Sequence, residues 1–184
     1  MKTYFTSDLH FTHESMIRFD NRPFTNVDEM DAELIKRWNS RVNKVDTVYV
    51  LGDIFWKASQ VGSILSQLNG HIVVIKGNHD KWTKRYKNSS QLVIKDYANI
   101  KVELEDGTIQ RVVLSHYPIL LYDGHYHETI MLFGHVHGTK EHQITMDQAK
   151  ELNSKDVRCK MYPAWCGWYD YTPVTLDEIL ERWS

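Results

Sequence analysis

His71-Ile72-Val73-Val74-Ile75-Lys76-Gly77-Asn78-His79-Asp80 is an apolar run of strand length that ends directly in polar side chains able to bind metal. The same order, an apolar run followed by Asp, Asn or His, recurs four more times. The other polar runs are Thr6-Ser7-Asp8-Leu9-His10, Leu51-Gly52-Asp53, Leu114-Ser115-His116 and Phe133-Gly134-His135-Val136-His137. Ligands bind outside the carboxyl ends of strands in α/β sheets, so five such ends predict one shared site.

The pattern around these runs predicts the architecture. Strands are expected over 2–6, 47–51, 71–75, 110–114 and 129–133, and helices over 26–42, 60–68 and 175–183. Alternating strands and helices in the first half predict parallel strands with helices outside. Asp106-Gly107, between strands over 101–105 and 108–114, predicts a hairpin. We therefore expect an α/β fold, a mixed sheet or two-sheet sandwich flanked by helices, with 138–163 forming a loop and a short helix over 146–152.

Length and composition limit the class of protein. A chain of 184 residues is expected to form a single domain over 1–184, and its formal net charge of −2 gives no overall basic field for nucleic acid. We find no leader-like segment and no run of about 20 apolar residues, so a cytoplasmic protein without membrane contact is expected. Cys159 and Cys166 are expected to be free thiols without a role.

The polar runs offer the mixed oxygen and nitrogen ligands of a transition-metal site. Such ligands suit manganese, iron, zinc, cobalt or nickel, whereas calcium prefers oxygen alone. In Asp8-x-His10 and His135-x-His137, alternating strand residues would point the same way and reach one ion together. One ion with an open position cannot use all seven candidates, so two ions sharing a carboxylate are expected. The seven are Asp8, His10, Asp53, Asn78, His116, His135 and His137.

His79 lies beside these candidates and is free to act as an acid or a charge-stabilising donor. Taken alone, each run has an ordinary explanation, because Asp, Asn and His often form turns and hydrogen bonds at strand ends. Five runs together favour the metal site. Of the five histidines outside these runs, four are expected at the surface or in loops, namely His71, His125, His127 and His142.

The ordered set Asp-x-His, Gly-Asp, Gly-Asn-His-Asp, His and Gly-His-x-His, over positions 8 to 137, resembles the calcineurin-like metallophosphoesterase superfamily. The resemblance implies an αββα sandwich with a dinuclear site and His79 as the catalytic histidine. One ion would be held by Asp8, His10, Asp53 and His137, and the other by Asp53, Asn78, His116 and His135. The start over 7–13, followed by Arg22-Pro23-Phe24, is similar to small bacterial and phage members.

One departure narrows the class of substrate. Protein Ser/Thr phosphatases of the superfamily continue Gly-Asp with Val-Asp-Arg-Gly, whereas this chain continues with Ile54-Phe55-Trp56-Lys57, which disfavours a phosphoprotein phosphatase. The resemblance implies a hydrolase that acts on a phosphodiester, or less favourably a phosphomonoester, through attack of a metal-bridging hydroxide. Two ions about 3.5–4 Å apart lower the pKa of such a water. Manganese is the favoured metal.

The short chain leaves little room for a capping domain, so a small phosphoester such as a nucleotide or cyclic nucleotide is the expected substrate. Loop side chains that could reach its phosphate are His13, Arg18, Arg22, Lys57 and Arg85, and aromatic rings that could stack on a base are Trp56, Trp82 and Tyr122.

Two alternatives stay open. A noncatalytic interaction scaffold of the same fold would typically have lost His79 or some ligands, and this chain has lost none. A nuclease predicts a basic groove, which the net charge does not support. The sequence carries no signal for an oligomeric state.

Overall fold

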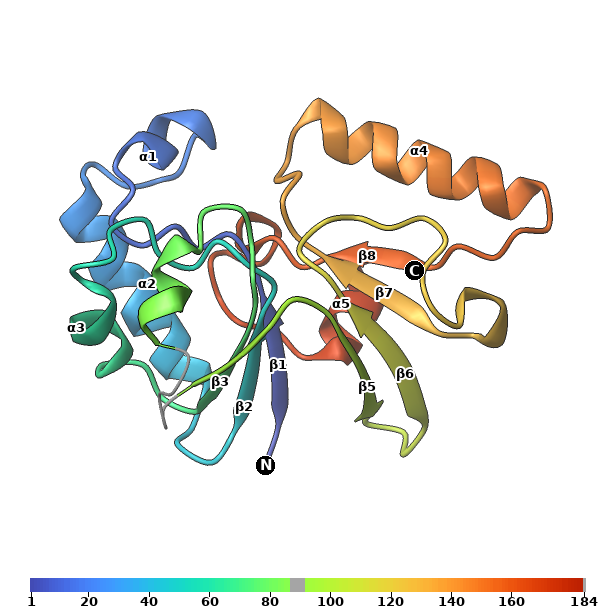
Figure 1. The fold of residues 1–184 in the computed structure, drawn as a ribbon, viewed down its shortest axis with the longest axis horizontal. Helices are drawn as coiled ribbons and strands as arrows, with labels where there is room; N and C mark the ends of the chain where they lie inside the picture. The colour runs from blue at the N-terminus through green and yellow to red at the C-terminus, as the bar shows by residue number, and fades with distance from the viewer. Residues whose placement is uncertain (87–91, 184) are drawn as a thin grey trace.

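Two four-stranded β-sheets form the centre of the molecule in this computed structural model, which describes residues 1–86 and 92–183 (Figure 1). The first sheet has the order β1-β2-β3-β4 and is entirely parallel. In the second sheet, β5 pairs antiparallel with β6, and β6, β7 and β8 run parallel. The strands are β1 Thr3–Thr6, β2 Thr47–Val50, β3 His71–Ile75, β4 Leu92–Lys95, β5 Ala98–Glu103, β6 Ile109–Leu114, β7 Ile130–Phe133 and β8 Met161–Pro163.

Helices cover the outer faces of both sheets, which makes the fold an αββα sandwich, as expected (Figure 1). Helices α2 and α3 pack on the first sheet, α4 packs on the second, and α5 contacts β1 and β8. The helices are α1 Ser15–Phe19, α2 Val27–Arg41, α3 Val61–Leu65, α4 Lys140–Ser154 and α5 Leu176–Trp183. Short 3-10 helices lie at Lys81–Arg85, His125–His127 and Cys166–Tyr169. No helix in the described ranges is both long and apolar enough to cross a membrane.

Apolar side chains between the two sheets hold the sandwich together. Phe5 and Ile75 of the first sheet and Leu114 and Leu132 of the second are fully buried in one cluster. Each such side chain contributes roughly 1.5–3 kcal/mol relative to exposure. A separate cluster packs α2 against the first sheet through the buried Trp38. These two clusters place the ends of β1, β2, β3, β6 and β7 at one rim of the sandwich.

The expected strands and the long helix are present with shifts of a few residues at their ends. Asn26 caps α2, because its Oδ1 accepts a hydrogen bond from the Glu29 backbone N–H at 2.9 Å. The hairpin turn lies at Asp106-Gly107, where Gly107 has a φ of +83°. The helix expected over 60–68 is shorter, since α3 covers Val61–Leu65.

The expectation for 138–163 is only partly right: the short helix expected over 146–152 lies within the longer α4, and β8 replaces part of the expected loop. The buried side of α4 is formed by His142, Thr145 and Ala149. Two of these three residues are polar, so the apolar repeat that predicts a helix is weak. His142 therefore lies buried in a helix and not at the surface or in a loop. The structure also adds α1 and β4.

Candidate metal centre

Loops at one rim of the sandwich bring the predicted ligands together, from the carboxyl ends of strands in both sheets. Two groups of candidate ligands have all their ligand atoms within 4.8 Å of one another. The first is formed by Asp8, His10 and His137, and the second by Asp8, Asp53 and His116. Asp8 belongs to both groups, so the two lie side by side.

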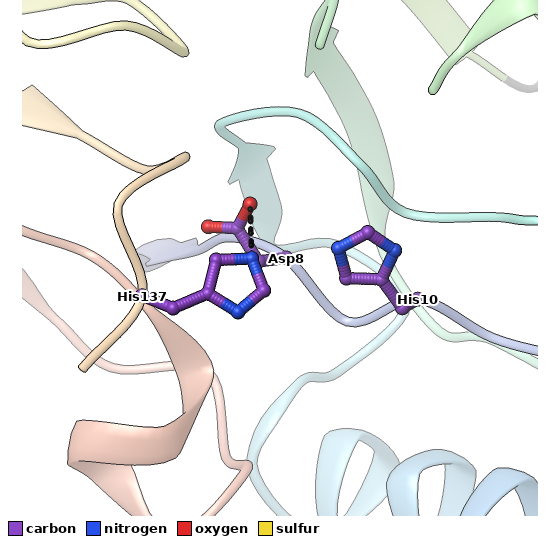
Figure 2. Close-up of side chains that lie close together, drawn as sticks. All are labelled: Asp8, His10 and His137. Carbon is purple, nitrogen blue, oxygen red and sulfur yellow. Dashed lines mark ion pairs between the residues drawn. The ribbon is translucent and has the colours of Figure 1, made fainter. Parts of the chain in front are cut away.

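Figure 2 shows the first group, with His10 and Asp8 on the segment after β1 and His137 on the segment after β7. The Nε2 atom of His137 lies 3.4 Å from Asp8 Oδ1. Asp8 is fully buried, and its carboxylate accepts hydrogen bonds from Ser7 Oγ at 2.5 Å and from the backbone N–H of His135 at 3.1 Å. The second sheet thus fixes the orientation of a ligand supplied by the first.

Asp53, a member of the second group, also faces the first. Its Oδ2 lies 3.8 Å from His10 Nε2 and 3.6 Å from His116 Nε2, one histidine from each group. Its Oδ1 accepts the backbone N–H of His79 at 2.9 Å. A carboxylate in this position can contact two neighbouring ions.

His116 is oriented so that its Nε2 is available as a ligand. Its Nδ1 lies 2.8 Å from the Leu51 carbonyl oxygen and donates to it, so Nε2 is the nitrogen that faces the site. That Nε2 lies 3.0 Å from Asn78 Oδ1. A proton on Nε2 joins the two atoms when the ring is charged, and a metal ion bound by both would take its place.

The backbone at the ligands is left-handed. Asp8, His10, Asp53, His135 and His137 have φ values of 56°, 53°, 54°, 72° and 44°. A non-glycine residue in this conformation costs of order 1–2 kcal/mol, and such residues concentrate at functional sites. The expected alternation along a strand is therefore wrong, because β1 and β7 end before these residues. Left-handed turns aim the side chains instead, and His135 and His137 do not join the same group.

Two glycines of the polar runs leave room for the ligands. A Cβ at Gly52 would lie 2.2 Å from His116 Nδ1, and Gly52 has a φ of +89°. A Cβ at Gly77 would lie 2.2 Å from Asp53 Oδ1 and 2.8 Å from its backbone nitrogen. Both distances are far below van der Waals contact, so the ligands can occupy these positions only beside glycine.

The charges of the site also fit a divalent cation. Burial raises the pKa of Asp53, and the charge of His116 offsets this only in part. Burial also opposes ionisation of Asp8, but the hydrogen bond and charge of His137 hold the pKa of Asp8 below its usual range. Burial likewise lowers the pKa of His137, yet its contacts with Asp20 and Asp8 dominate and raise it to about 10. Without metal, a proton on His137 balances the buried carboxylates, and a bound cation would do the same.

Asp20 and Arg22 support the first group and were not predicted in this role. Asp20 Oδ1 lies 2.8 Å from His137 Nδ1. The guanidinium of Arg22 donates to Asp20 Oδ2 and to the carbonyl oxygens of Asp8 and Leu9, at 2.8, 2.9 and 2.7 Å. Arg22 is only 4% exposed, so the expectation that it contacts phosphate is wrong. No spacing rule marks Asp20, because it approaches His137 only in three dimensions.

Asp80 ties together the loops after β2 and β3. Its carboxylate accepts the backbone N–H groups of Asp53 and Gly77 at 2.8 and 2.9 Å, and the Trp82 indole N–H at 2.8 Å. Trp82 is buried in the core and cannot stack on a base. Asp80 ends the Gly-Asn-His-Asp run, so its position in that run is the signal that could have identified it.

The remaining candidates differ in exposure. The side chain of His79 is 37% exposed, with its Nε2 3.9 Å from Asp53 Oδ2. Asn78 and His135 are exposed at the rim.

Trp56 is 44% exposed and stacks on His13, with ring centroids 3.8 Å apart. Tyr122 is buried, and its hydroxyl donates to backbone carbonyls of Thr129 and Lys160, so it cannot stack on a base. Arg18, Lys57 and Arg85 are exposed.

Comparisons with known proteins find relatives of similar sequence and a solved structure of similar fold. The chain is 32% identical to the Gene 66 protein of Mycobacterium phage L5, over 84% of this chain and 90% of that protein. It is also 47% identical to an uncharacterized protein of Methanocaldococcus jannaschii. That match covers 47% of this chain and 51% of the relative, about half of its length. A crystal structure of a protein of unknown function from Aquifex aeolicus matches with a TM-score of 0.69 and 26% identity, over 97% of each chain.

A family model described as calcineurin-like phosphoesterase matches residues 1–183. The family and the Asp/His groups together indicate a metal-dependent phosphoesterase in general terms. The chain belongs to the calcineurin-like phosphoesterase family.

Proposed function

We propose that this protein hydrolyses a small phosphodiester at a site for two divalent transition-metal ions, with manganese as the favoured metal. The observation that carries the proposal is the pair of adjoining Asp/His groups, which share Asp8 and in which Asp53 of the second group also lies 3.8 Å from His10 of the first. A phosphomonoester is the less favoured substrate.

The proposed ligands would form two sets, one for each ion, with Asp53 in both. Asp8, His10, Asp53 and His137 would hold one, and Asp53, Asn78, His116 and His135 would hold the other. When bound, the ions supply an activated water and neutralise the phosphate oxygens. Asp20 keeps the His137 ring in position through its contact with Nδ1. Ser7 and the His135 backbone keep Asp8 in position in the same way.

In this proposal, His79 would donate a proton to the leaving oxygen. It is the partly exposed histidine next to Asp53, and its backbone N–H is held by Asp53 Oδ1. Its ring lies between those of His10 and Trp56, with centroids at 5.6 and 5.0 Å. General acid catalysis of this kind contributes typically about 10²–10⁴-fold to the rate.

The test is hydrolysis of bis-p-nitrophenyl phosphate and p-nitrophenyl phosphate by metal-stripped protein resupplied with manganese. We expect turnover that requires manganese, with the diester preferred. His79→Ala should lower kcat by about 10²-fold or more while retaining both ions, as measured by elemental analysis. His71→Ala is the matched control, since His71 is exposed at the start of β3.

Two results would contradict the proposal. Loss of bound metal in His79→Ala would make this residue a ligand and not the acid. Binding of two ions without turnover of either ester would favour a noncatalytic scaffold of the same fold.

A further inference from the structure

A cavity of about 830 Å³ opens beside the candidate metal centre, at the carboxyl ends of β3 and β4. Asn78 and His116 line it, so it shares two residues with the proposed ligand set. Four lysines also line it: Lys76 after β3, Lys81 and Lys84 on the adjacent 3-10 helix, and Lys95 at the end of β4.

The cavity is positively charged although the whole chain is not. Of its two carboxylates, Asp80 is buried and bonded to backbone N–H groups, and Asp96 pairs with Lys76 at 2.6 Å. Within residues 1–86 and 92–183, the ammonium groups of Lys81, Lys84 and Lys95 form no ion pair. The formal net charge of the chain is −2, so three unpaired ammonium groups around one cavity are a local feature.

The size and chemistry of the cavity fit a small anion. Sites for small molecules typically enclose about 300–1,000 Å³, and this cavity lies within that range. Lysine binds phosphate as a compact point charge with three donors, and such charge-assisted hydrogen bonds are roughly twice as strong as neutral ones. A cavity of this volume suits one or two phosphate groups better than an extended nucleic-acid strand.

We propose that this cavity binds a second, non-reacting phosphate group of the substrate. The proposal rests on the proposed function, because the reacting phosphate would lie at the metal centre and the second would extend past Asn78 toward Lys84 and Lys95. The substrate class is then a phosphodiester that carries a further phosphate, for example a nucleotide esterified at one end of its sugar and phosphorylated at the other.

Direct binding tests the cavity without catalysis. Inorganic pyrophosphate is titrated into metal-free protein in a calorimeter at low salt, for the wild type and for Lys84→Gln/Lys95→Gln. We expect binding that weakens with added salt and a loss of about tenfold or more in affinity in the double variant. Lys44→Gln/Lys150→Gln removes two exposed lysines elsewhere and should bind like the wild type. No pyrophosphate binding, or an equal loss in both double variants, would overturn the proposal.

Kinetics with a matched pair of esters links the cavity to the reaction. Thymidine 5′-(p-nitrophenyl phosphate) and its 3′-phosphorylated analogue differ by one phosphate. We expect the analogue to have a KM about tenfold lower, and Lys84→Gln/Lys95→Gln to remove that difference. Equal KM values in the wild-type protein would overturn the proposal.

The two measurements separate this inference from the proposed function. If pyrophosphate binds as expected but neither ester is hydrolysed with manganese, the phosphate cavity stands and the hydrolase proposal fails. If both esters are hydrolysed with equal KM and pyrophosphate does not bind, the hydrolase stands and the cavity fails. Binding of a single-stranded oligonucleotide through the same lysines, without pyrophosphate binding, would favour a nucleic-acid surface and also overturn the small-substrate proposal.

Discussion

Replacement of Arg22 by alanine should destabilise the protein and loosen the metal centre together. The Arg22 side chain is completely buried and pairs with Asp20, whose side chain is 5% exposed. It also donates to the carbonyl oxygens of Asp8 and Leu9, which flank the first ligand group. Arg22→Ala therefore removes the cation from a buried carboxylate and leaves two carbonyl groups without these donors.

The size of the effect follows from these contacts. Removing one partner of a buried ion pair costs about 3–5 kcal/mol, and each unsatisfied buried acceptor about 1–3 kcal/mol. These costs do not add fully, because water can enter the space that the guanidinium leaves. Asp20 also keeps its contact with His137. We therefore expect the free energy of unfolding to fall by about 3 kcal/mol, a large part of the roughly 5–15 kcal/mol of a typical domain.

Urea unfolding of the metal-free protein, followed by circular dichroism, measures this loss. Arg18→Ala is the matched control, because Arg18 is exposed beside Phe19, and it should change stability by less than about 0.5 kcal/mol. Arg22→Lys keeps the charge but not the forked geometry and should fall between the two. Metal affinity of Arg22→Ala should drop about 10–100-fold, because the support of Asp20 and thus of His137 is weakened. A stability loss below about 1 kcal/mol would refute the assignment of Arg22 as a buried support.

Three further predictions concern other parts of the site and its surroundings. Asp53→Ala should leave less than one ion per chain by elemental analysis, because Asp53 Oδ2 faces both ligand groups; two retained ions would contradict this. Gly77→Ala should cost about 1–3 kcal/mol in urea unfolding, since its Cβ would lie 2.2 Å from Asp53 Oδ1. Gly62→Ala in α3, with its nearest atom at 3.4 Å, should show no such cost. Burial raises the pKa of Asp31 to about 6. The folded state therefore keeps a proton on Asp31 that the unfolded chain loses near pH 4. The free energy of unfolding of the wild type should fall as the pH rises from about 4 to about 6. Asp31→Asn should make that fall smaller but not remove it, because burial also raises the pKa of Asp53. Parallel pH curves for the two proteins would disprove the shift of Asp31.

Local patterns were enough to predict a mixed sheet or two-sheet sandwich flanked by helices and the chemistry of the candidate site, whereas the αββα arrangement was implied by the resemblance to the calcineurin-like metallophosphoesterases. Short runs rich in β-branched residues, such as His71–Ile75, favour buried strands. The side chains that directly follow such a run then lie at the carboxyl end of the strand. Only the part of helix α4 over 146–152 was predicted; its first turns were not, because the buried positions His142 and Thr145 are polar. Strand β8 has only three residues, which is too short for a clear alternation.

The residues that hold the ligands in position, Asp20 and Arg22, could not be predicted from the sequence for a different reason. Asp20 contacts His137 across 117 positions of the chain, and Arg22 reaches back to the carbonyl oxygens of Asp8 and Leu9. These contacts depend on how the α1 segment folds over the ends of β1 and β7, and no spacing in the sequence records them. The same holds for the lysine-lined cavity, whose lysines come from the segment after β3, from the 3-10 helix and from β4.

The order of residues was thus sufficient to predict most of the strands, the helices with a clear apolar repeat and the chemistry of each candidate ligand, since period, composition and chain neighbours determine these properties. Tertiary structure alone decided three features of the site. It set the direction in which each ligand points and made Asp8 common to both ligand groups. It also brought to the neighbouring cavity three lysines that form no ion pair within the described residues. The physical reason is that left-handed turns and packing between two sheets set distances between atoms far apart in the chain. Those distances determine which charges are shared and which remain unpaired.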